Sequence, residues 1–189
     1  MSDYSSFGDW LIHNITAVVA LVSAVIAFSA VLINAHLTRS KNAIDFWSAY
    51  HASAQQKEST KAMVEWVHGK PTPEQTRALG VLPFKDPILS THIREILSTW
   101  ERVSIAIRKK VYDEDLLFDA YGSSIVDLWI NFRPFIEERR KANDRLYVHF
   151  LWLVKRWQVR IANDREQAAI RRKAQADSLI HDKNKIHTS

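Results

Sequence analysis

The stretch "ITAVVALVSAVIAFSAVLI", Ile15 to Ile33, is an uninterrupted apolar segment in a chain in which 25% of the residues are charged. It contains no charged residue, no proline and no glycine. About 19 helical residues at about 1.5 Å each cover close to 30 Å, which is the hydrocarbon thickness of a bilayer. The segment therefore predicts a transmembrane helix.

Two alternatives compete with a membrane span. A cleaved signal peptide needs a basic leading region and a shorter apolar run, whereas Met1 to Trp10 carries Asp3 and Asp9 and no lysine or arginine. A buried helix of a soluble domain usually keeps a polar stripe, which this segment lacks. We therefore interpret residues 1–38 as a transmembrane anchor with a short external N-terminus.

The charges that flank the anchor predict its orientation. Arg39 and Lys41 follow the apolar run directly, while the leading end is acidic. The positive-inside rule then places the carboxyl side in the cytosol. We expect a protein of the bacterial inner membrane, with its N-terminus outside and its C-terminal domain in the cytoplasm.

The rest of the chain is long enough for one domain with its own core. The absence of cysteine excludes disulfides and thiolate metal sites. Glycine is scarce, and no window shows sustained period-two alternation. We predict an all-α fold in which the membrane helix continues into a cytosolic bundle of about four to five helices over residues 39–162. Residues 163–189 form a basic polar tail, helical or disordered.

Two boundaries near the start of the domain are marked by proline. The first helix is expected to continue into the cytosol as far as "HGKPTP", where Gly69 and Pro71 would end it. Asp86 and Pro87 form a cap and first-turn pair that opens a core helix. Its apolar positions recur at three and four residues: Ile93, Ile96, Leu97, Trp100, Val103 and Ile107.

Three later boundaries are also predicted. Gly122 would stop a short helix that begins at the acidic "YDEDLL". Pro134 would kink or restart the following helix. Asn143 or Asp144 would cap the last one.

No nucleotide-binding or hydrolase signature is present, because the chain lacks GxGxxG, GxxxxGK followed by Ser or Thr, HExxH and GxSxG. His92 and Glu95 lie one helical turn apart, but they supply only two ligands of a metal site. The acidic cluster Asp113, Glu114 and Asp115 is explained by its place at a helix start. We therefore expect no catalytic residue, no metal and no cofactor.

Glu101 lies at the edge of the apolar face of the core helix and needs a polar partner there. The arginines Arg133, Arg139 and Arg140 follow in the sequence and can form a bidentate pair with a carboxylate. We predict a structural pair of Glu101 with Arg139 that fixes which helix docks against which.

Small residues recur on one side of the membrane helix at spacings of three and four: Ala17, Ala20, Ala24 and Ala27, with Asn34 further along. Membrane helices associate through close backbone approach at small residues and through polar hydrogen bonds. This pattern indicates a homo-oligomer, unless the alanines only reflect the usual composition of membrane helices.

Basic residues gather towards the C-terminus, in a chain of net charge +5. The candidate basic face comprises Lys155, Arg156, Arg160, Arg171, Arg172 and Lys173. Beside a bilayer, such residues attract anionic lipid head groups. Nucleic acid is a less favoured partner, and a plain solvated face is the simplest alternative.

The segments "TWERVSIAIRKKVYDEDLL" and "WINFRPFIEERRK" resemble an uncharacterised family of bacterial and phage-encoded proteins. The matching positions are Trp100, Glu101, Arg102, Ile107, Arg108, Asp113, Leu116, Trp129, Pro134, Ile136 and Arg139. The resemblance covers the layout from Met1 to about Trp157. It implies a membrane helix followed directly by a helical cytosolic domain of unknown function, and leaves the activity open.

These observations lead to two hypotheses. The first is a non-enzymatic, single-pass membrane protein that presents a helical interaction or regulatory module to an unknown protein partner. The alternative is an oligomeric membrane-perturbing effector of phage defence or superinfection exclusion, whose assembled helices make the membrane leak.

Overall fold

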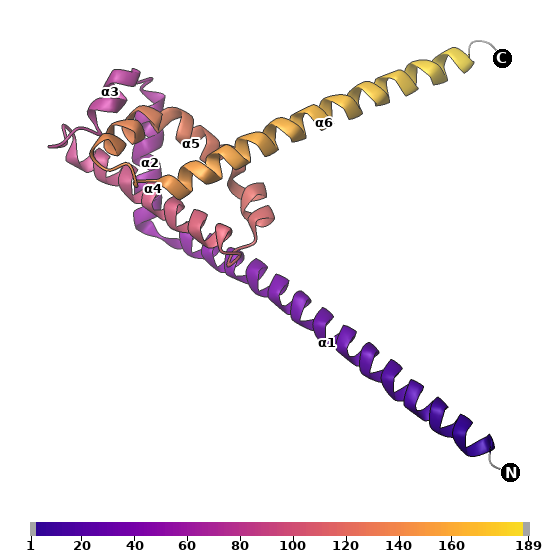
Figure 1. The fold of residues 1–189 in the computed structure, drawn as a ribbon. Coiled ribbons are helices and arrows are strands. Elements are labelled where there is room, and N and C mark those ends of the chain that lie inside the picture. Colours follow the sequence, from indigo (N-terminus) through magenta and orange to yellow (C-terminus); the bar gives the residue numbers. More distant parts are fainter. Residues whose placement is uncertain (1–2, 187–189) are drawn as a thin grey trace.

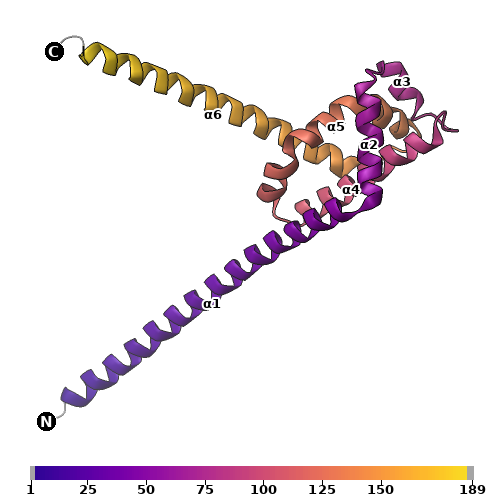
Figure 2. The same cartoon turned by 180° about the vertical axis from the view of Figure 1, so that it is seen from behind.

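The computed structural model describes the backbone of residues 3–186 and the side chains of residues 14, 15 and 17–175. This part of the chain forms only helices, as the sequence predicts. They are α1 (Asp3–Ala52), α2 (Ala54–His68), α3 (Pro73–Ala78), α4 (Pro87–Arg108), α5 (Glu114–Ala142) and α6 (Val148–Ile186). Figures 1 and 2 show one bundle, from which α1 and the far part of α6 project as two long arms.

The apolar segment of α1 makes no contribution to the core of the bundle. Its large side chains lie open to the surroundings, with Val22 50%, Phe28 66% and Ile33 61% exposed. The helix is long and apolar enough to cross a membrane. These exposures contradict the alternative of a buried helix, because a core helix would hide such side chains.

The same helix continues without a break into the bundle, where Ala43 is fully buried and Phe46 and Tyr50 pack against the core. The predicted end at Gly69 was wrong for α1, which stops at Ala52. Ser53 has an extended backbone, and its hydroxyl accepts a hydrogen bond from the Gln56 N–H at 3.3 Å. This cap starts α2, which packs along α4. The chain therefore leaves α1 at a polar cap residue, well before Gly69.

Trp100 on α4 lies at the centre of the core and is only 1% exposed. Its ring meets Phe46 and Tyr50 of α1, with centroids 6.0 and 6.2 Å away. It also meets Tyr121 of α5 at 5.1 Å and Trp157 of α6 at 6.2 Å, all in edge or T-shaped arrangements. One side chain thus joins four helices.

The predicted stop at Gly122 does not occur, and α5 also runs through Pro134 without restarting there. The neighbours of each residue supply the reason. A Cβ at Gly122 would lie 2.9 Å from the Phe118 ring, so this glycine allows close packing within the helix. Phe135 and Ile136 beside Pro134 are fully buried. We infer that this burial outweighs the cost of a helical proline, about 3 kcal/mol.

The last helix begins later than predicted and has a different cap. Asn143 closes a turn by accepting the Arg145 N–H at 3.0 Å, and α6 starts only at Val148. The carboxylate of Glu101 accepts the backbone N–H groups of His149 at 3.2 Å and Phe150 at 2.7 Å. Glu101 therefore caps α6 from the neighbouring helix, where its charge also suits the helix dipole.

The predicted ion pair of Glu101 with Arg139 is not formed. The two oxygens of Glu101 are taken by α6, and the Arg139 guanidinium lies 5.2 Å from the centre of the Phe84 ring. The sequence correctly indicated that Glu101 has a structural role in helix docking. The partner was missed because backbone N–H groups leave no mark in a sequence pattern.

We predict that Glu101→Ala lowers the free energy of unfolding by about 1–2 kcal/mol, because it leaves two helix N–H groups without an acceptor. The measurement is urea unfolding of the detergent-purified full chain, followed by tryptophan fluorescence. Glu65→Ala is the matched control, since its ion pair with Lys61 is exposed and should contribute less than about 1 kcal/mol. Equal losses in the two variants would contradict the capping role.

Candidate functional site

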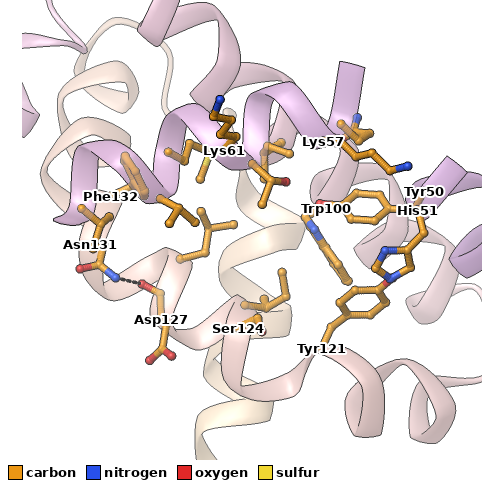
Figure 3. A pocket seen from close by; sticks show the side chains of 18 of the residues that line it. Tyr50, His51, Lys57, Lys61, Trp100, Tyr121, Ser124, Asp127, Asn131 and Phe132 are labelled. Carbon is orange, nitrogen blue, oxygen red and sulfur yellow. Dashed lines mark hydrogen bonds between the residues drawn. The ribbon is translucent and has the colours of Figure 1, made fainter. Parts of the chain in front are cut away.

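A cavity of about 700 Å³ opens beside α2, α4 and α5, close to the end of α1 (Figure 3). Its apolar lining includes Met63 of α2, Ile96 and Trp100 of α4, and Ile125 and Phe132 of α5. This volume lies in the range of small-molecule and side-chain binding sites. The bundle thus has a concave apolar surface next to its central tryptophan.

Charged and polar side chains surround this apolar lining (Figure 3). Lys57 and Lys61 lie one turn apart on α2, while Asp127 and Asn131 come from α5. The Asn131 side-chain amide donates to the backbone oxygen of Asp127 at 2.8 Å, which holds the amide in place. The cavity therefore offers an apolar floor with both positive and negative groups at its edge.

His51 and Tyr121 form the end of the cavity nearest α1. The Tyr121 hydroxyl lies 3.1 Å from Nε2 of His51, and the two rings stack with centroids 6.0 Å apart. Burial, with a smaller contribution from Tyr50, raises the pKa of Tyr121 to about 12. The phenol is therefore neutral near pH 7 and acts there as a hydrogen-bonding group.

The pair His92 and Glu95 is used to join helices. The hydroxyl of the fully buried Ser59 lies 2.9 Å from Nδ1 of His92 and donates to Glu95 at 2.9 Å. These contacts link α2 to α4. In the part of the chain with described side chains, no group of three or more histidine and acidic residues is arranged to hold a metal ion.

The candidate basic face is not assembled as predicted. Arg156 binds Glu114 at 2.6 Å, a contact that raises the pKa of the guanidinium. Arg160 pairs with Asp115 and lies 3.9 Å from the centre of the Phe118 ring. Both arginines therefore fasten α6 to the acidic start of α5.

The other four members are exposed but do not form one group. Lys155 is in the bundle, whereas Arg171, Arg172 and Lys173 lie on the projecting part of α6 (Figure 1). Successive residues of a helix are rotated by about 100°, so the last three do not share a side. The sequence showed that basic residues are dense in this segment. It did not show their positions around the helix or the acidic residues that bind two of them.

The structure also shows a polar junction that the sequence did not indicate. It lies between α1 and the connection that precedes α5. The Asp113 N–H donates to the Arg39 oxygen at 3.3 Å, and the Ser40 hydroxyl donates to the Asp113 carboxylate at 2.7 Å. Burial acts to raise the pKa of Asp113, but the hydrogen bonds from Ser40 and from backbone N–H groups outweigh it and lower the pKa. Asp113 is thus a carboxylate that caps α5 and binds α1.

The predicted small-residue face of α1 lies far from the bundle. Ala17, Ala20, Ala24, Ala27 and Asn34 are all exposed along the projecting arm. This side of the helix is accessible to a second copy or to lipid.

These features define an all-helical protein with one long apolar N-terminal helix that joins directly to a bundle. A family model, Domain of unknown function (DUF4760), matches residues 16–157. The chain belongs to this family, which agrees with the resemblance to a family of unknown function. No curated protein and no solved structure matches the chain. The match begins within the apolar run and ends at Trp157, so it includes both the long helix and the core.

We predict that Tyr121→Phe removes one phenol titration with a midpoint at about pH 12. The folded pKa is above the unfolded value of about 10, so the stability that it contributes is full below pH 10 and is lost as the pH rises through 12. The measurement is tyrosinate absorbance of the full chain against pH. Tyr4→Phe is a control for the loss of one phenol, and an unchanged titration near pH 12 in Tyr121→Phe would contradict the assignment.

Proposed function

We propose that the chain is a single-pass, non-enzymatic protein of the bacterial inner membrane that presents a helical interaction or regulatory module to the cytoplasm. The observation that carries this proposal is the state of α1, whose apolar segment is exposed while its last turns are packed in the core. A helix with this exposure needs lipid or another apolar partner around it. Its rigid connection to the bundle would hold the module at the membrane surface.

The same continuity favours a permanent anchor over a signal peptide. Cleavage after the apolar run would remove the start of a helix whose later residues Ala43 and Phe46 belong to the core. The family model also includes most of the apolar run together with the bundle. Both observations support an anchor that stays part of the protein.

Charge supports the proposed orientation. Arg39 and Lys41 follow the apolar run, and the bundle adds Arg108, Lys109 and Lys110 close to the same end, through the contacts of the α4–α5 connection with α1. An excess of basic residues on one side of a span favours the cytoplasm for that side.

The module itself offers the cavity beside Trp100 as a site for a partner. Its apolar lining suits an apolar side chain or small molecule, and Lys57, Lys61 and Asp127 at its edge supply polar selectivity. The exposed alanine face of α1 offers a second contact, with another copy of the chain in the membrane. A protein that binds through both surfaces is suited to regulation by assembly.

The alternative function is an oligomeric membrane-perturbing effector of phage defence or superinfection exclusion. It would use the same alanine face for assembly and would need polar groups towards a pore. The Ser29 hydroxyl donates to the Val25 oxygen at 2.8 Å, so it is already satisfied within its own helix. A hydroxyl bound to its own helix does not need a pore to satisfy it. The cavity beside Trp100 is the feature that favours the interaction module.

We predict that cysteines at Ala20, Ala24 and Ala27 form disulfide-linked dimers when isolated membranes are oxidised. The chain has no native cysteine, so any dimer reports the introduced site. Val22→Cys and Ile26→Cys are matched controls on another side of the same helix, and they should link weakly. Equal linking at all positions, or none, would contradict a specific assembly and leave α1 as a plain anchor.

A measurement in cells that express the protein distinguishes the two proposed functions. Expression of the native chain should leave the membrane potential unchanged, as a voltage-sensitive dye measures it. A loss of potential that disappears with a variant blocking dimer formation would contradict the module and favour the effector.

A further inference from the structure

The connection between α4 and α5 is fixed against α1 immediately beyond the apolar run. Asn42 donates its side-chain amide to the Val111 oxygen at 3.2 Å, and Asp113 is bound to Arg39 and Ser40 as described above. Leu37, the last large apolar residue before Arg39, lies four residues beyond the apolar run and is 59% exposed. Arg39 follows it by two residues, about 3 Å along a helix axis. The connection therefore lies level with the end of the apolar segment.

Four basic residues lie at this level, around α1 and on the adjoining end of α4, and we name them the junction surface. They are Arg39, Lys41, Lys109 and Lys110. The three lysines are exposed, and none of the four forms an ion pair with any residue whose side chain the structure describes. The surface therefore has positive charge that the bundle does not neutralise.

The backbone presents this charge together with an apolar residue. Lys110 has a left-handed φ of 57°, which turns the chain sharply after the last turn of α4. Val111 follows and is 45% exposed, although its backbone oxygen is bound to α1. An apolar residue flanked by lysines is the composition that suits the interface between head groups and acyl chains.

We propose that the junction surface binds the head groups of anionic phospholipids. This inference rests on the proposed function, because it requires that α1 spans the bilayer. The end of the apolar run then lies at the boundary of the hydrocarbon core, and the contacts to α1 place Lys109 and Lys110 at head-group level. The lipid contact would set the tilt of the bundle against the membrane.

This surface fits anionic lipid better than the C-terminal basic residues do. Arg156 and Arg160 are engaged by acidic residues of α5, and Arg171 and Arg172 lie on the part of α6 that projects away from α1 (Figures 1 and 2). The junction residues instead come from two segments that hydrogen bonds hold together. We therefore assign lipid binding to the junction surface and not to the predicted C-terminal basic face.

The test uses the full chain in nanodiscs made of phosphatidylcholine and phosphatidylglycerol. A fluorescent probe is attached to a single introduced cysteine at Val111, and a nitroxide quencher is placed on the upper acyl chain of either lipid, at equal mole fraction. Two further probe sites report position. Ile26→Cys lies in the apolar segment, and Ile88→Cys lies at the other end of α4, roughly 30 Å from Lys109.

The Val111 probe should be quenched more strongly when phosphatidylglycerol carries the nitroxide. The double variant Lys109→Gln with Lys110→Gln should lower this preference by about fivefold or more, because each basic residue near the surface adds to the attraction. The control variant Lys70→Gln with Lys85→Gln removes the same charge, and Lys70 shares the left-handed backbone of Lys110 with a φ of 50°. It should keep the preference.

Three results would overturn the inference while the proposed function stands. The first is equal quenching of the Val111 probe by both lipids, and the second is no quenching there while the Ile26 probe is quenched. The third is an equal loss in both double variants, because the effect would then follow net charge alone. An unquenched Ile26 probe would overturn the proposed membrane span and the inference with it.

Discussion

The packing of aromatic rings around Trp100 is the interaction on which the rest of the structure depends. Rings from α1, α5 and α6 meet this one buried side chain of α4. Aromatic pairs of this kind add to the free energy that burial already supplies. Because Phe46 and Tyr50 belong to the same helix as the apolar segment, the core and the proposed anchor form one rigid element.

The direct connection of α1 to the core determines which of the two projecting helices can act on the bundle. The proposed anchor enters the core directly, so a change in its tilt or in its association with another copy would act on the rings around Trp100. The cavity lies against the same tryptophan, with His51 and Tyr121 between it and α1. Among the described side chains, the far part of α6 has no such connection, because the core residues of this helix end at Trp157.

Local signals predicted the elements whose causes lie within a few residues. The apolar run of α1, the stripe on α4 and the caps at Asp86 and Asp113 could all be recognised this way. The failures share one cause, which is contact between distant segments. Packing carries α5 through Gly122 and Pro134. The cavity and the junction at Arg39 left no sequence signal, since their residues come from separate helices.

The central claim is that α1 crosses the membrane and holds the bundle on the cytoplasmic side. The most direct measurement is labelling with a membrane-impermeant maleimide in intact bacterial cells, using one cysteine at Ser6 and another at the exposed Glu58 of α2. We predict that the Ser6 site is labelled in intact cells and that the Glu58 site is labelled only after permeabilisation. Labelling of Glu58→Cys in intact cells, or a mature chain that lacks residues 15–33 by mass spectrometry, would contradict the account.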